Sequence, residues 1–177
     1  VSVLGITAGF ASAQSAIITF LPIYLRVELG YSPLVMSAFI SASQVGGIVS
    51  QPVMGYLSDR YSRKAVLLPS ILSLGAAVLA IPFVGPGFPL LVVVGLMGAF
   101  AFPLMAILLA AALDVAGSDV PATTVSLVFG AAIVFSAVTP ALAGVLADAY
   151  GLRAAFLLAA GVAFATAGFT ALRSLSD

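Results

Sequence analysis

Long stretches without a charged residue alternate along the chain with short charged groups. The uncharged runs cover residues 1–25, 29–58, 65–113, 120–147 and 154–172. An α-helix needs about 20 mostly apolar residues to cross a bilayer, so four of these runs fit one helix each. The run at 65–113 is long enough for two helices, and Gly85-Pro86-Gly87-Phe88-Pro89 interrupts it with residues that end helices. The pattern therefore predicts six membrane-spanning helices.

The predicted spans lie near residues 1–24, 34–57, 64–84, 89–113, 121–147 and 153–173. Apolar segments of this length must be helical inside lipid, because a barrel strand has only about 10 residues and alternates in character. We therefore expect an all-α integral membrane protein in which residues 1–177 form a single six-helix bundle.

The composition indicates the same class. Hydrophobic residues make up 63% of the chain and charged residues 7%, and the mean hydropathy is +1.28, which leaves too little polar surface for a water-soluble globule. Six basic residues balance six acidic ones, so nothing suggests a nucleic-acid partner. Without Cys or His the chain lacks thiolate and imidazole metal ligands, and we expect neither a metal nor another cofactor.

The basic residues predict an orientation in the membrane. Short loops rich in Lys and Arg remain in the cytoplasm, which places the turn between the second and third spans there. Both ends of the chain are then cytoplasmic, because six is an even number of spans. The basic residues divide into four cytoplasmic and two outside: Arg60, Arg63, Lys64 and Arg173 against Arg26 and Arg153. We expect a multi-pass protein of the cytoplasmic (inner) membrane and, since the chain begins at Val1 without a basic leader, a fragment of a longer protein.

Two segments that lie 89 residues apart resemble each other. Residues 55–68 and 144–157 are identical at six of fourteen positions, which include the pair Asp59 and Asp148. This offset is half the chain length, so we predict two three-helix repeats, residues 1–88 and 89–177. The second is inverted because each repeat has an odd number of spans. Inverted repeats are typical of secondary transporters. Chance similarity between two apolar helix ends is the alternative.

Residues 55–64 read G-Y-L-S-D-R-Y-S-R-K, which resembles the signature loop of the major facilitator superfamily, G-x-L-[SA]-D-[RK]-x-G-R-[RK]. The segment lies where that family has its loop, between the second and third helices of a six-helix half. The resemblance implies that the chain is half of a twelve-helix transporter and packs against the other six-helix half. The segment Phe20-Leu-Pro-Ile-Tyr24 resembles the first helix of a carboxy-terminal half. Ser62 departs from the usual Gly but can still cap the third helix.

The resemblance also implies a role for the loop, that of a conformational latch that keeps the cytoplasmic side closed. Its residues are Gly55, Leu57, Asp59, Arg60, Arg63 and Lys64. By local chemistry, Gly55 permits two backbones to approach closely, and Asp59 precedes Arg63 by four residues, the favourable order for a helical ion pair. Asp59 can also lie against a helix N-terminus, and the capped start at residues 118–121 can receive an acidic loop from the other half. A plain positive-inside anchor is the alternative.

No charged residue is expected inside a span, so a residue that carries protons through the membrane is not predicted in this half. Uncharged polar and aromatic side chains remain as candidates for substrate binding: Gln14, Ser37, Ser41, Gln44, Phe100 and Phe102. Gln14 and Gln44 lie near the middle of the first two spans, and two amides facing one cavity can orient a neutral or zwitterionic ligand. Hydrogen bonds between helices and simple packing are the alternatives.

The fifth span carries Gly130, Pro140 and Gly144. Small residues at such spacing permit close helix packing, and Pro140 frees a backbone carbonyl and bends the span.

These observations favour half of a secondary transporter that moves a small molecule across the membrane by alternating access, with a preference for efflux of an amphipathic compound. A stand-alone six-helix protein, channel-like or oligomeric, is the alternative. An intramembrane enzyme is disfavoured, because there is no His base and no G-x-S-x-G, H-E-x-x-H or intramembrane Asp pair.

Overall fold

The computed structural model describes residues 2–116 and 121–172, which form six α-helices and no strand. The helices are α1 (Ser2–Val27), α2 (Pro33–Arg60), α3 (Arg63–Ala80), α4 (Phe88–Ala116), α5 (Pro121–Tyr150) and α6 (Leu152–Leu172). All six are long and apolar enough to cross a membrane. The predicted six-span, all-α fold is thus confirmed. Most helices extend a few residues beyond the predicted spans, whereas α3 ends at Ala80 and a turn follows where the third span was expected to continue.

The turns at the helix ends follow local chemistry. Ser62 caps α3 as expected, because its Oγ accepts a hydrogen bond from the backbone N–H of Ala65 at 3.1 Å. The corresponding position 89 residues later is Gly151, which has φ +87° and makes the turn between α5 and α6. Only Gly adopts this left-handed conformation without strain. The two related turns therefore reverse the chain by different means, a side-chain cap and a left-handed glycine.

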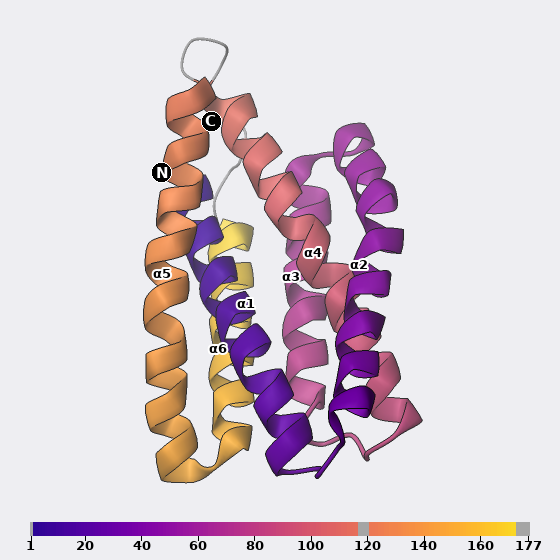
Figure 1. The fold of residues 1–177 in the computed structure, drawn as a ribbon. Coiled ribbons are helices and arrows are strands. Elements are labelled where there is room, and N and C mark those ends of the chain that lie inside the picture. The colour runs from indigo at the N-terminus through magenta and orange to yellow at the C-terminus, as the bar shows by residue number, and fades with distance from the viewer. Residues whose placement is uncertain (1, 117–120, 173–177) are drawn as a thin grey trace.

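Helix packing divides the bundle into two groups. Figure 1 shows α5, α1 and α6 on one side and α3, α4 and α2 on the other. The most extensive contacts join α2 to α4 and α1 to α5, followed by α1 with α6, α3 with α6 and α3 with α4. If α1 is exchanged with α4, α2 with α5 and α3 with α6, the same set of helix contacts results. Such a pattern is what an inverted repeat of residues 1–88 and 89–177 produces, and the repeat itself stays a prediction.

The core lies between α1, α3, α4 and α6. Most of its largest fully buried side chains are on these helices and include Phe10, Leu67, Leu104 and Phe156. In contrast, α2 and α5 bury only 17% and 11% of their spans, against 61% for α1. These two helices expose large apolar side chains such as Ile48 and Val145. They carry an apolar surface that no other part of the described chain covers.

Two helix backbones lie in close contact where α2 crosses α4. A Cβ on Gly98 would lie 1.9 Å from the carbonyl oxygen of Ser43, and one on Gly46 would lie 2.3 Å from the carbonyl oxygen of Gly95. Only glycine fits such distances. By contrast, a Cβ on Gly130 would meet no atom within 4 Å, and one on Gly144 only the Phe20 ring, at 3.9 Å. The expectation of close packing at Gly130 and Gly144 is therefore not met within the described chain.

One end of the bundle carries the α2–α3 turn, residues 61–62, and is here named the loop end. Figure 1 shows that α4 ends and α5 begins at this same end, toward which the start of α1 and the end of α6 also point. The predicted capped start of the fifth span, Ser118-Asp119-Val120, lies outside the described residues, as do Val1 and Arg173.

Candidate functional site

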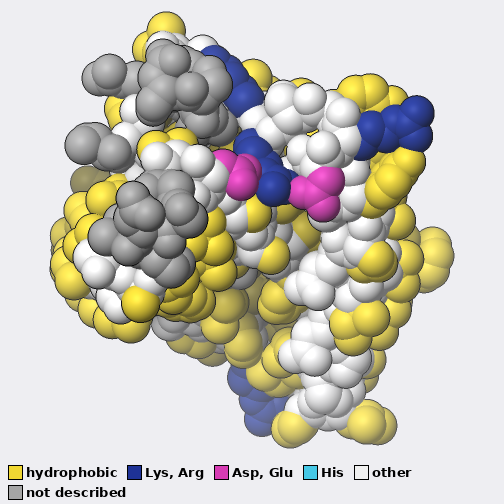
Figure 2. Space-filling model, turned by 90° about the horizontal axis from the view of Figure 1, so that it is seen from above, with side chains coloured by type: hydrophobic (Ala, Val, Ile, Leu, Met, Phe, Trp, Pro, Cys, Tyr) yellow, Lys and Arg dark blue, Asp and Glu magenta, His cyan; other side chains and the backbone are white. Residues whose placement is uncertain are grey.

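A network of charged side chains joins three helices at the loop end. Arg63, the first residue of α3, forms an ion pair with Asp59 in the last turn of α2. Its Nε also donates a hydrogen bond to Oδ2 of Asp114, in the last turn of α4, at 2.9 Å. Figure 2, which looks onto this end, shows basic and acidic side chains meeting there. The predicted pair of Asp59 and Arg63 is present, and Asp114 is a partner that the sequence did not indicate.

The other residues of the loop make separate contacts. Lys64 Nζ donates to the carbonyl oxygen of Ala171 at 2.8 Å, at the C-terminal end of α6, where a positive charge is favourable. Arg60 Nη1 donates to the Tyr56 hydroxyl at 2.6 Å on its own helix. Leu57 packs against the core. The loop thus links the ends of α2, α3, α4 and α6 to one another.

A cavity of about 270 Å³ lies beside this network, and we name it the loop cavity. Gly55, Asp59 and Arg63 line one side of it, and α4 lines the other with Pro103 and Ala106. Gly55 was expected to allow close contact between two backbones, but a Cβ there would meet no atom of the described chain within 4 Å. Within this chain Gly55 therefore borders open space.

Two further cavities lie near the middle of the bundle. The first, about 280 Å³, lies between α1, α2 and α4 and is named the front cavity; Gln14, Gln44 and Phe102 line it. The second, about 330 Å³, lies between α1, α4 and α5 and is named the rear cavity; its lining includes Gln14, Thr19 and Met105. Because Gln14 lines both, it stands at the boundary between them.

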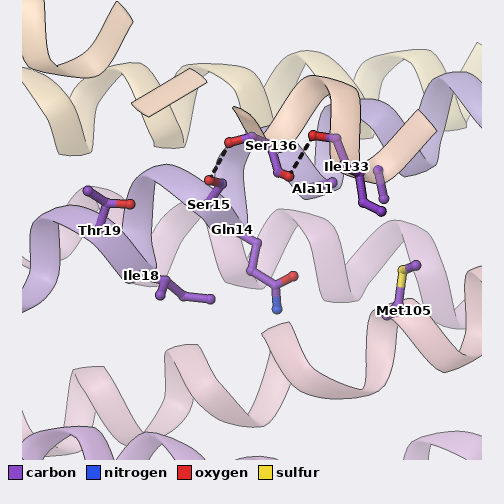
Figure 3. A pocket seen from close by; sticks show the side chains of 9 residues that line it. Ala11, Gln14, Ser15, Ile18, Thr19, Met105, Ile133 and Ser136 are labelled. Atoms are coloured by element: carbon purple, nitrogen blue, oxygen red, sulfur yellow. Dashed lines mark hydrogen bonds between the residues drawn. The ribbon is translucent and has the colours of Figure 1, made fainter. Parts of the chain in front are cut away.

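The Gln14 side chain is turned away from α5 and into the space between α1 and α4 (Figure 3). No hydrogen bond joins the amide of Gln14 or of Gln44 to another described residue. The hydrogen bonds between helices that were the alternative role for these amides are thus not made within the described chain. Every residue that lines the front or rear cavity is uncharged, so their walls are apolar apart from amide and hydroxyl groups.

The structure brings together only some of the candidate residues. Gln14, Gln44 and Phe102 share the front cavity. Ser37 is exposed and donates a hydrogen bond to the carbonyl oxygen of Leu34 in its own helix. The remaining two line neither cavity, since Ser41 is exposed and Phe100 packs against the core.

Some residues of the site were not predicted. Ile18 lines both cavities and lies one helical turn after Gln14, and Thr19 places a hydroxyl in the rear cavity. The helical spacing from Gln14 could have indicated Ile18. Within the described residues, no group of three or more His, Cys, Asp or Glu side chains is placed to hold a metal ion.

The six apolar helices, the uncharged cavities at mid-bundle and the charged network at one end define a multi-pass membrane protein with uncharged cavities between its helices. The sequence profile of the Major Facilitator Superfamily matches residues 3–175, so the chain belongs to this family. Membership places the chain among membrane transporters and not among enzymes.

Two known proteins are similar to the chain in sequence. The chain is 33% identical over 165 residues to the multidrug resistance protein MdtG of Proteus mirabilis, a match that covers 89% of this chain and 39% of that protein. It is 40% identical over 69 residues to the bacillibactin exporter of Bacillus subtilis, a match that covers 38% of this chain and 17% of the exporter. The chain therefore spans well under half the length of either relative.

Proposed function

We propose that the chain is one half, the carboxy-terminal one, of an alternating-access transporter that exports neutral or zwitterionic amphipathic molecules across the cytoplasmic membrane. The observation that carries the proposal is Gln14, an amide without a partner in the described chain at the boundary of two uncharged cavities near mid-bundle. The names of the two relatives, a multidrug resistance protein and an exporter, support the outward direction.

The cavity walls favour this class of substrate. Apolar walls bind the apolar body of a ligand, and a few polar groups fix its orientation. The amides of Gln14 and Gln44 offer both a donor and an acceptor, so they match carbonyl, hydroxyl or amide groups. A ligand with a lone net charge would lose its hydration without gaining an opposite charge, because no charged side chain lines either cavity.

In this proposal the charged network holds the loop end closed during part of the cycle. The carboxylate side chains of Asp59 and Asp114 are 69% and 59% exposed although each pairs with Arg63. Exposed oxygen atoms can therefore also receive a helix N-terminus from the other six-helix half. The proposal places the loop end, and both ends of the chain, on the cytoplasmic side.

The test uses protection of an introduced cysteine by the neutral amphipathic dye nile red. The sequence has no Cys, so Ala101→Cys places a single thiol in the lining of the front cavity. In the full-length transporter, otherwise free of cysteine, nile red should slow the reaction of this thiol with N-ethylmaleimide. Gln14→Leu should raise the half-protecting dye concentration about fivefold, the factor for the loss of a hydrogen bond worth about 1 kcal/mol.

Gln51→Leu is the matched control, since it makes the same change on α2 at a residue that lines neither the front nor the rear cavity. It should leave protection at the parent level. Equal protection in Gln14→Leu and the parent would remove Gln14 from the site. Absence of protection in every variant would contradict binding in the front cavity.

A further inference from the structure

Each of the first five helices has an internal proline. In two helices that line the cavities it lies ten or more residues from either end, Pro103 in α4 and Pro140 in α5. Proline has no N–H, so the carbonyl group four residues earlier loses its helical partner. The carbonyl groups left in this way are those of Ala99 and Ser136. In lipid an unpaired carbonyl is strongly disfavoured, and each of these groups needs another donor.

In both helices the donor is a serine hydroxyl from a neighbouring helix. Ser50 Oγ on α2 donates to the carbonyl oxygen of Ala99 at 2.6 Å, and Ser15 Oγ on α1 donates to that of Ser136 at 2.6 Å. Figure 3 shows the second of these bonds in the wall of the rear cavity. Other buried helical hydroxyl groups, such as that of Ser70, donate within their own helix instead.

The two bonds lie in related helix contacts. One lies in the contact of α2 with α4 and the other in that of α1 with α5, the two most extensive helix contacts. The exchange of three-helix groups interconverts these contacts, although it pairs the donor helix of one bond with the acceptor helix of the other. Each proline site also borders a cavity, since Pro103 lines the loop cavity and Ser136 lines the rear cavity. A helix that lacks one backbone hydrogen bond bends most easily at that point.

Ser50 can release its partner without leaving its own hydroxyl unpaired. The carbonyl oxygen of Gly47, one turn earlier on α2, lies 3.1 Å from Ser50 Oγ and is a second acceptor for the same proton. Serine in helices commonly uses such an acceptor on its own helix. Ser50 therefore has two satisfied states, one that holds α4 and one that does not.

We propose that Ser15 and Ser50 are positioning residues of the transport cycle. Each holds the proline site of a helix that lines a cavity in one bend and releases it when the cavity changes shape. This inference rests on the proposed function, because it assigns the two bonds to the same conformational cycle, but it is tested by a readout that needs no substrate.

The test measures the reaction of N-ethylmaleimide with one introduced cysteine in the reconstituted full-length transporter, otherwise free of cysteine. Ala106→Cys reports on the loop cavity and Ala132→Cys on the rear cavity. Ser50→Ala should change the first rate, and Ser15→Ala the second, by about threefold, the factor that an interhelical hydrogen bond is worth in a membrane protein. The control Ser70→Ala removes a hydroxyl that donates within α3 and should change neither rate.

Removing the proline should abolish the effect of the serine. In Pro103→Ala the carbonyl of Ala99 regains a backbone donor, so adding Ser50→Ala should leave the Ala106→Cys rate unchanged. A serine effect of the same size with and without Pro103 would overturn the inference, because the hydroxyl would then act by packing alone.

A second pair of variants decides the question if Pro103→Ala does not reach the membrane. Ser50→Thr keeps the hydroxyl, whereas Ser50→Val has the same shape without it. The threonine variant should keep the parent labelling rate and the valine variant should not; equal rates in the two would overturn the inference.

Failure of nile red to protect Ala101→Cys would count against the proposed function but leave these rates as they are, so the two failures are distinguishable.

Discussion

Arg63 brings three helix ends together through one guanidinium group, which contacts Asp59 of α2 and Asp114 of α4 from the first residue of α3. Exposed ion pairs typically stabilise a fold by about 0 to 1 kcal/mol, so the network contributes little to folding. Its larger effect is on position, because it fixes where the exposed carboxylate of Asp59 lies at the loop end.

Asp59→Asn should reduce transport while the protein inserts normally. The change keeps the size of the side chain but removes the charge that pairs with Arg63 and that would receive a helix N-terminus. We expect export of nile red to fall about fivefold, the factor for roughly 1 kcal/mol, at an unchanged amount of protein in the membrane measured by immunoblotting. Asp148→Asn is the matched control, because Asp148 lies near the other end of the bundle. Parent rates of export in Asp59→Asn would contradict the role of the network.

At the residue scale the sequence predicts contacts between near neighbours better than contacts across the bundle. The pair of Asp59 and Arg63 follows from a spacing of four residues. Asp114 is 51 residues from Arg63, and their contact depends on how α3 packs against α4. Ser41 and Gln44 share a helical stripe, yet only Gln44 reaches a cavity, because a stripe does not say which part of it faces open space.

At the scale of helices, the spans and their ends were predictable but the packing was not. Charges and turn residues mark where a span must stop, so the six helices appear close to their expected positions. Helix crossings depend on which glycines face the backbone of a neighbouring helix. Gly98 and Gly46 form the tight crossing of α2 and α4, whereas Gly130 faces no other part of the described chain.

Gly98→Ala should destabilise the protein, because the added Cβ would lie 1.9 Å from a backbone carbonyl oxygen that no side-chain movement can relieve. Overpacking of this kind typically destabilises by about 1 to 3 kcal/mol. Thermal unfolding of the purified protein in detergent should show a lower midpoint. Gly161→Ala is the control, because the new Cβ on α6 would contact no neighbouring part of the described chain within 4 Å. Its unfolding midpoint should equal that of the parent protein. Equal midpoints in the two variants would contradict the crossing.

At the scale of the molecule, the poor burial of α2 and α5 supports the proposal that the chain packs against another six-helix half. The membrane class and the family were predictable from the sequence, because charge spacing and the segment at residues 55–64 are local features. The two cavities that meet at Gln14 were not, since they arise from contacts among four helices.

The proposed orientation places residues 61–62 in the cytoplasm and the α1–α2 turn outside. In intact cells that make the full-length protein without other cysteines, a membrane-impermeant maleimide should label Glu28→Cys but not Tyr61→Cys. Both positions are exposed in the structure. Opening the cells should make Tyr61→Cys reactive, which serves as the control. Labelling of Tyr61→Cys in intact cells would reverse the orientation.

The central claim is that this bundle forms half of an exporter whose substrate passes through the cavities at Gln14. Export of nile red from preloaded, energised cells measures this most directly, because the dye loses its fluorescence as it leaves the membrane for water. Cells with the full-length transporter should lose fluorescence several-fold faster than cells without it, and Gln14→Leu at equal abundance should remove most of the difference. The same rate of loss with and without the transporter would contradict the claim.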